Sequence, residues 1–205
     1  MLLVLLIASC GEDNTTTYEF ENWQSKNETY WNSLYATAQQ NISSGDKSWK
    51  ILPVWSRDES PTLKSTDHIV VHVLEQGSGT QQPLYTDTVR VHYAGRLIPS
   101  PNFSNGYPFD KSFSDDSLDP TISVPYKNAV SSFVEGFATA LLYMHVGDSW
   151  EVYVPYTLGY GTNANSSTNI PGYSTLIFNM TLAGIYHPGK VVPEWSAKPS
   201  FFYWE

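Results

Sequence analysis

The sequence predicts an α+β protein built on an antiparallel sheet. Segments rich in β-branched and aromatic residues outnumber segments with helical spacing. The two kinds of segment do not alternate regularly, as they would in a parallel α/β fold. Hydrophobic residues make up 41% of the 205 residues, so the chain can bury a core of its own.

Four long segments carry the strand pattern. Residues 69–74 form a run of isoleucine, valine, histidine and leucine that ends before Gly77-Ser78-Gly79. The same pattern predicts strands at residues 88–97, 150–155 and 174–185. Residues 46–66 contain prolines and polar residues, and we interpret them as a connector with a short strand near residues 49–54.

Two segments have helical spacing. Between residues 19 and 40, the apolar side chains recur at intervals of three, four and seven: Phe20, Trp23, Tyr30, Trp31, Leu34, Tyr35 and Ala38. This aromatic stripe is expected to dock on the main domain, and the alternative is a helix that binds a partner or a second copy. A shorter helix is predicted at 132–144, where Ser132 and Glu135 have capping-box spacing and Gly147 follows the end.

The first residues resemble an export signal. Residues 2–9 are apolar or small and stand directly before Cys10, as in a bacterial lipobox, although no lysine or arginine precedes them. We expect a lipoprotein signal at 1–10, lipid attachment at Cys10 and a polar tether at 11–18. The alternatives are a soluble export signal with an incidental cysteine and a cytosolic apolar strand.

Composition excludes several classes of function. Asp and Glu number 20 against 11 Lys and Arg, which gives a net charge of −9 and disfavours nucleic acid as a partner. The single cysteine excludes an intrachain disulfide and a cysteine-based zinc site. His68 and His72 lie in a strand-like run, where their spacing does not direct both onto one metal ion. No cofactor or metal is therefore expected.

Five segments, in order, resemble the FK506-binding-protein (FKBP) type of peptidyl-prolyl cis-trans isomerase. They are VRVHYAG at 89–95, GYPFDKSF at 106–113, VEGF at 134–137, MHVGD at 144–148 followed by VPYTLGYG at 154–161, and NIPGYSTLIF at 169–178. The resemblance covers residues 67–186. It leaves an N-terminal helix and connector at 19–66 and an aromatic tail at 187–205, which we expect to lie against the protein, for example on the N-terminal helix.

The resemblance implies a sheet of five or six antiparallel strands curled around one short helix, with the active pocket between them. Its floor would be Phe137, and its walls and rim Tyr93, Phe109, Phe133, Val134 and Phe178. Asp110 would place a carboxylate near the prolyl amide, and Tyr160 would offer its hydroxyl to the substrate carbonyl. Ile170 would pack at the mouth and donate its backbone N–H. Taken one by one, the aromatic residues also suit an ordinary β core, and Asp110 suits a turn.

Three segments depart from the family pattern. Residues 114–124 lack the aromatic residue that closes one side of the pocket, so that wall is expected to be thinner. Residues 100–107 form an insertion before Phe109, and the loop 162–169 is polar apart from Ala164. These departures concern substrate preference more than the fold.

The function that follows is prolyl isomerisation. The protein would assist the folding of exported, proline-containing polypeptides in the bacterial cell envelope, anchored there by lipid; the resemblance is to lipoproteins of Bacteroidetes-like bacteria. The thinner wall and polar loop favour an alternative, a non-catalytic chaperone that holds such chains. A third possibility is an interaction lipoprotein that acts through its helical and aromatic extensions.

Overall fold

The computed structural model describes residues 19–57, 62–114, 118–119, 122–164 and 169–196. The predicted signal, Cys10 and the tether lie outside these residues, as does the end of the aromatic tail. Within the described part of the chain, no helix combines the length and the apolar character that crossing a membrane requires.

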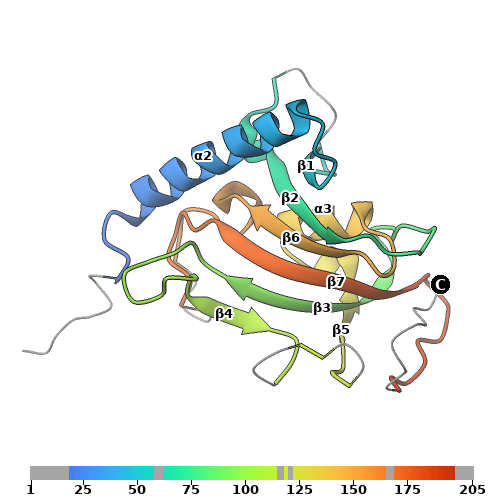
Figure 1. Ribbon diagram of the computed structural model, residues 1–205. Coiled ribbons are helices and arrows are strands. Elements are labelled where there is room, and N and C mark those ends of the chain that lie inside the picture. Colours follow the sequence, from blue (N-terminus) through green and yellow to red (C-terminus); the bar gives the residue numbers. More distant parts are fainter. Residues whose placement is uncertain (1–18, 58–61, 115–117, 120–121, 165–168, 197–205) are drawn as a thin grey trace, which may run out of the picture.

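One antiparallel sheet organises the fold (Figure 1). The described residues contribute seven strands to it: β1 (Trp49–Pro53), β2 (His68–Glu75), β3 (Thr88–Arg96), β4 (Pro108–Lys111), β5 (Tyr126–Ala129), β6 (Ser149–Val154) and β7 (Leu176–Tyr186). The strand order is β1-β2-β6-β7-β3-β4, and β5 also pairs with β3. The sheet does not close into a barrel, and the predicted α+β class with an antiparallel sheet is confirmed.

The strand predictions for the four long segments and for the connector are confirmed. The sheet has more strands than the family resemblance implies, because β1 comes from the N-terminal extension and pairs with β2 from Trp49 to Pro53. The pattern did not single out β4 and β5. Each has only four residues and no β-branched side chain, so neither carries a strand signal of its own.

The helix α3 (Glu135–Tyr143) packs on one face of the sheet (Figure 1). The predicted start at Ser132 and the capping box are wrong. Val134 is the N-cap residue, and none of the described side chains forms a capping hydrogen bond there. Phe133 has extended backbone angles, so the helix cannot begin before it. The Glu135 carboxylate instead accepts a hydrogen bond from the Ser56 hydroxyl.

The N-terminal helix α2 (Trp23–Ser43) docks on the sheet through its aromatic stripe, as predicted. Trp23, Trp31 and Ala38 are buried. Tyr30 lies close to the charged pair of Arg96 and Glu151. Successive side chains of a strand point to opposite faces of the sheet. Arg96 and Glu151 alternate with residues that face α3, so Tyr30 and the rest of α2 lie on the face opposite α3.

The described part of the C-terminal tail also lies on the sheet, but over β3 rather than on α2. The half-buried Trp195 ring is 6.3 Å from the His92 ring, centroid to centroid, and the Arg90 guanidinium lies 5.6 Å from the Trp195 ring centroid. The Arg90 side chain also donates to the Pro193 carbonyl at 2.5 Å. His92 is thereby buried, with no hydrogen-bond partner for either ring nitrogen among the described residues.

This burial makes the fold sensitive to acid. Desolvation lowers the pKa of His92 to about 4, whereas in the unfolded chain it returns to its ordinary value near 6.5. The unfolded state therefore binds a proton first as the pH falls, and stability is lost between about pH 6.5 and 4. Urea unfolding across this range should show the loss, and His92→Phe should flatten it. An equal pH dependence in both proteins would contradict the assignment.

Candidate active site

A cavity of about 300 Å³ opens between α3 and the sheet. It is lined by Tyr93, Phe109, Asp110, Tyr126, Asn128, Ser132, Phe133, Val134, Phe137, Tyr160 and Phe178. The structure thus brings together every pocket residue named from the sequence except Ile170. The Ile170 side chain is only 1% exposed, so its proposed place at the mouth remains a prediction.

Phe137 forms the centre of an aromatic cluster. Its ring meets the Tyr93 and Phe178 rings edge-on, at centroid distances of 5.6 and 5.0 Å, and stacks on Phe133 at 4.5 Å. These are the favourable geometries for aromatic pairs. Four rings from α3, β3 and β7 and from the turn before α3 therefore build one apolar concavity, of a size suited to a proline ring.

The strand period of β3 determines which residues face this cavity. Tyr93 and Gly95 point toward α3, whereas Ala94 and Arg96 point away. A β-carbon on Gly95 would lie 2.6 Å from the Phe109 ring and 2.9 Å from the Phe178 ring. Glycine at this position therefore allows both rings to approach the strand and form the wall.

A polar group lies at the edge of the aromatic cluster. The Tyr93 hydroxyl donates a hydrogen bond to Asp110 Oδ2 at 2.7 Å. Burial raises the pKa of Tyr93, and the hydrogen bond to Asp110 raises it further. Burial also raises the pKa of Tyr160, with a contribution from the Asp110 charge. Both phenols therefore stay protonated at neutral pH, and Tyr160, 38% exposed, is available as a donor to a bound chain.

Tyr126 was missed by sequence reasoning. It lies on β5, and its ring meets Tyr93 edge-on at 6.0 Å and Phe133 at 6.1 Å. The wall expected to be thin is therefore closed by an aromatic residue. Tyr126 lies two positions beyond the segment 114–124 in which the family pattern predicts that residue. Pairing of β5 with β3 sets Tyr126 opposite Val91, and this register places its ring beside Tyr93.

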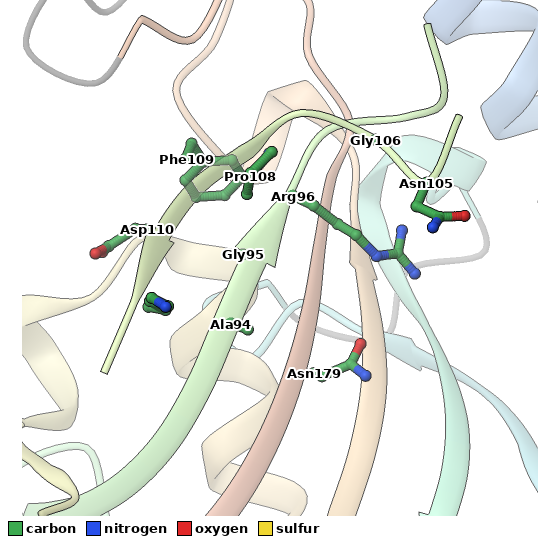
Figure 2. A pocket seen from close by; sticks show the side chains of 10 residues that line it. Ala94, Gly95, Arg96, Asn105, Gly106, Pro108, Phe109, Asp110 and Asn179 are labelled. Carbon is green, nitrogen blue, oxygen red and sulfur yellow. The ribbon is translucent and has the colours of Figure 1, made fainter. Parts of the chain in front are cut away.

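A larger hollow of about 580 Å³ lies on the other face of β3 (Figure 2). It is bounded by Ala94, Arg96, Asn179 and the inserted loop at Asn105, and it shares Phe109 and Asp110 with the smaller cavity. Figure 2 shows the Arg96 side chain directed away from Asp110, and its guanidinium pairs with Glu151 at 2.5 Å. The larger hollow lacks the converging rings and phenols, so the smaller cavity is the better candidate for the active site.

The described residues contain no cluster of three or more histidine, cysteine, aspartate or glutamate side chains that could hold a metal ion. The polar groups that line the candidate site include the hydroxyls of three tyrosines and the Asp110 carboxylate, next to a wall of aromatic rings. This arrangement is suited to binding and orienting an apolar, amide-containing ligand.

Comparisons with known proteins identify the family of this chain. Residues 79–183, just over half of the chain, match the model of the FKBP-type peptidyl-prolyl cis-trans isomerase family. The chain belongs to this family. The match includes all the residues that line the candidate cavity.

Two relatives and one solved structure illustrate the similarity. The chain is 36% identical over 113 residues to the FKBP-type 22 kDa peptidyl-prolyl cis-trans isomerase of Escherichia coli. This alignment covers 55% of this chain and 48% of that protein. It is 33% identical over 128 residues to the macrophage infectivity potentiator of Trypanosoma cruzi, covering 62% and 58% respectively. The chain thus spans about half the length of these relatives. A peptidyl-prolyl cis-trans isomerase structure from Pseudomonas syringae shares the fold, with a TM-score of 0.56, 21% identity, and coverage of 80% of this chain and 96% of that one.

Proposed function

We propose that this chain catalyses the cis-trans isomerisation of X–Pro peptide bonds in polypeptides. The observation that carries the proposal is the aromatic cavity, with Phe137 at its centre and with Tyr93, Asp110 and Tyr160 at its polar edge. Family membership supports the same activity.

The proposed chemistry needs no nucleophile. Rotation about a peptide bond faces a barrier of roughly 18–20 kcal/mol, because resonance gives the C–N bond partial double-bond character. The twisted amide has lost this resonance and its charge separation, so an apolar cavity favours it over the planar amide. A preference of about 7 kcal/mol would accelerate the rotation by roughly 10⁵.

Each side chain has a distinct role in this proposal. Phe137 supports the proline ring, and the other aromatic residues exclude water around it. Tyr160 donates to the carbonyl of the bound chain. Asp110 accepts from Tyr93, which holds that ring in the wall, and places negative charge beside the rotating amide.

Asp110→Ala tests the polar part of the site. We expect kcat/KM for a short X–Pro peptide to fall about ten- to hundredfold, because Tyr93 loses its acceptor and the cavity loses the Asp110 carboxylate that lines it. The full chain would be compared with the variant in an isomer-specific peptide assay. Glu75→Ala is the matched control, since it removes an exposed carboxylate at the far end of β2. Equal rates for Asp110→Ala and the unaltered chain would contradict this role.

We further propose that the substrates are exported proteins in the cell envelope and that Cys10 carries the lipid. The support is the apolar segment directly before Cys10. Newly exported chains arrive unfolded and with mixed prolyl isomers, which interconvert slowly without a catalyst.

Lipid attachment has a direct test. The full chain, expressed in a bacterium, is expected to sediment with membranes and to incorporate labelled palmitate, whereas Cys10→Ser should incorporate none. Equal labelling of both chains, or no labelling of either, would contradict the anchor.

One observation favours the alternative of a chaperone that holds unfolded chains with little turnover. Ile122 and Val124, which precede Tyr126 in the chain, are 62% and 60% exposed. Exposed apolar side chains near a binding site are suited to holding unfolded polypeptide. Suppressed aggregation of an unfolded client by a protein inactive on X–Pro peptides would favour this alternative.

A further inference from the structure

Two buried side chains of α2 hold the segment 171–175, which follows the polar loop 162–169 in the chain. The indole N–H of Trp23 donates to the Ser174 hydroxyl at 2.8 Å. One helical turn later, Asn27 Oδ1 accepts from the backbone N–H of Thr175 at 2.7 Å. Trp23 is 6% exposed and Asn27 is 1% exposed. These contacts join residues that are separated by 151 and 148 positions in the sequence.

Loss of either contact would leave a buried polar group without its hydrogen-bond partner. Asn27 uses its other amide atom as well, donating from Nδ2 to the Trp23 carbonyl at 2.9 Å. Ser174 and Thr175 are only 3% and 1% exposed. A buried backbone N–H without an acceptor is costly. The position of Thr175 is therefore tied to the position of Asn27.

The segment that α2 holds is itself bonded to the turn that carries Tyr160. The Ser174 hydroxyl donates to the Pro171 carbonyl at 2.6 Å, and Tyr173 N–H donates to the Gly161 carbonyl at 2.9 Å. Gly161 N–H in turn donates to the Tyr156 carbonyl at 2.8 Å. Gly161, the residue after Tyr160, is thus hydrogen-bonded through its N–H to Tyr156 and through its carbonyl to Tyr173, and these bonds fix the turn.

Close packing reinforces these hydrogen bonds. A β-carbon on Gly172 would lie only 2.0 Å from the Thr162 carbonyl oxygen, so the two backbone segments are in direct contact. Tyr173 has a φ of 62°, which is unusual for a residue with a side chain and persists only where the surroundings enforce it. The rings of Tyr173 and Tyr156 lie 5.1 Å apart.

We propose that α2 is a positioning element of the active site, in which Asn27 and Trp23 set the location of the Tyr160 hydroxyl through residues 171–175. This inference rests on the proposed isomerase function. Asn27 and Trp23 lie outside residues 79–183, so they belong to the N-terminal extension rather than to the family domain. They touch no substrate and act through Tyr160.

The first test does not depend on activity. Amide hydrogen exchange at Gly161 and Tyr173 is measured in the full chain, in Asn27→Ala and in the matched control Asn32→Ala, which removes an exposed amide from the same helix. We expect exchange at both amides to be about tenfold faster in Asn27→Ala and unchanged in the control. Exchange in the β2–β6 ladder should not change. Unaltered exchange at Gly161 and Tyr173 in a folded Asn27→Ala would overturn the proposal.

The second test asks whether Asn27 acts through Tyr160. We expect Asn27→Ala to lower kcat/KM about five- to tenfold in the unaltered chain but by less than about twofold when Tyr160→Phe is already present. Equal losses in both backgrounds would show that Asn27 does not act through Tyr160 and would overturn the inference. Trp23→Phe keeps an aromatic side chain but removes the indole donor together with part of the ring system, so it serves if Asn27→Ala does not fold.

The two tests separate this inference from the proposed function. If the unaltered chain fails to isomerise X–Pro peptides, the proposed function fails, and the exchange experiment still decides whether α2 fixes the Tyr160 turn. If the chain is active but Asn27→Ala changes neither exchange nor coupling, the inference fails alone.

Discussion

Phe137→Ala is expected to remove measurable isomerisation of an X–Pro peptide and to lower the free energy of unfolding by about 3–5 kcal/mol. The ring is 2% exposed and contacts three other rings of the pocket. Truncation opens the floor to water, so the planar and twisted amides are solvated alike and the preference for the twisted form is lost. Peptide kinetics and urea unfolding measure the two effects.

A matched control separates the catalytic loss from the loss of stability. Leu141→Ala truncates another buried residue of α3 that does not line the cavity, so it should lose about 2–5 kcal/mol of stability while retaining activity in the folded protein. Phe137→Trp should keep a flat apolar floor and remain active. Full activity of folded Phe137→Ala would show that the ring is part of the core only.

Gly95→Ala is expected to lower kcat/KM at least tenfold and to cost about 1–3 kcal/mol of stability. The new methyl group would lie 2.6 Å from the Phe109 ring and 2.9 Å from the Phe178 ring, so both walls of the pocket must move. A displacement of this size close to the reacting amide is sufficient to spoil the fit.

Gly184→Ala is the control for this substitution. It adds the same methyl group on the neighbouring strand β7, where its closest neighbour is the Tyr186 hydroxyl at 3.2 Å. We expect it to change stability slightly and peptide kinetics not at all. Equal activity of Gly95→Ala and Gly184→Ala would contradict the role assigned to the Phe109 and Phe178 walls.

Local pattern was sufficient for most of the fold. The long strands have β-branched runs, and α2 has an aromatic stripe at helical spacing, so each shows its own signal in the sequence. β5 shows none, since Tyr126 is its only residue with a strand preference and the segment becomes a strand by pairing with β3. The start of α3 was misplaced because Ser132 and Glu135 have capping-box spacing, but Phe133 is extended.

The candidate site also has a part that the sequence predicts and a part that it does not. Its aromatic residues were predicted from motif order, and the structure gathers them around Phe137. Tyr126 could not be predicted, because its place depends on the register of a strand without a sequence signal. Trp23 and Asn27 form hydrogen bonds with residues 174 and 175, and these bonds depend on how α2 docks on the sheet. The apolar stripe of α2 predicts that the helix docks, but it does not predict which polar groups of the helix form hydrogen bonds with the main domain.

We propose that this cavity binds a proline ring and lowers the barrier to rotation of its amide. Exchange spectroscopy on a short X–Pro peptide, with a small amount of the full chain added, measures both at once. The uncatalysed isomers interconvert in tens to hundreds of seconds; we expect exchange within about one second, together with magnetisation transfer from the proline ring to the Phe137 and Tyr93 rings. A folded chain that leaves the exchange rate unchanged, or accelerates it without contact to these rings, would contradict the account.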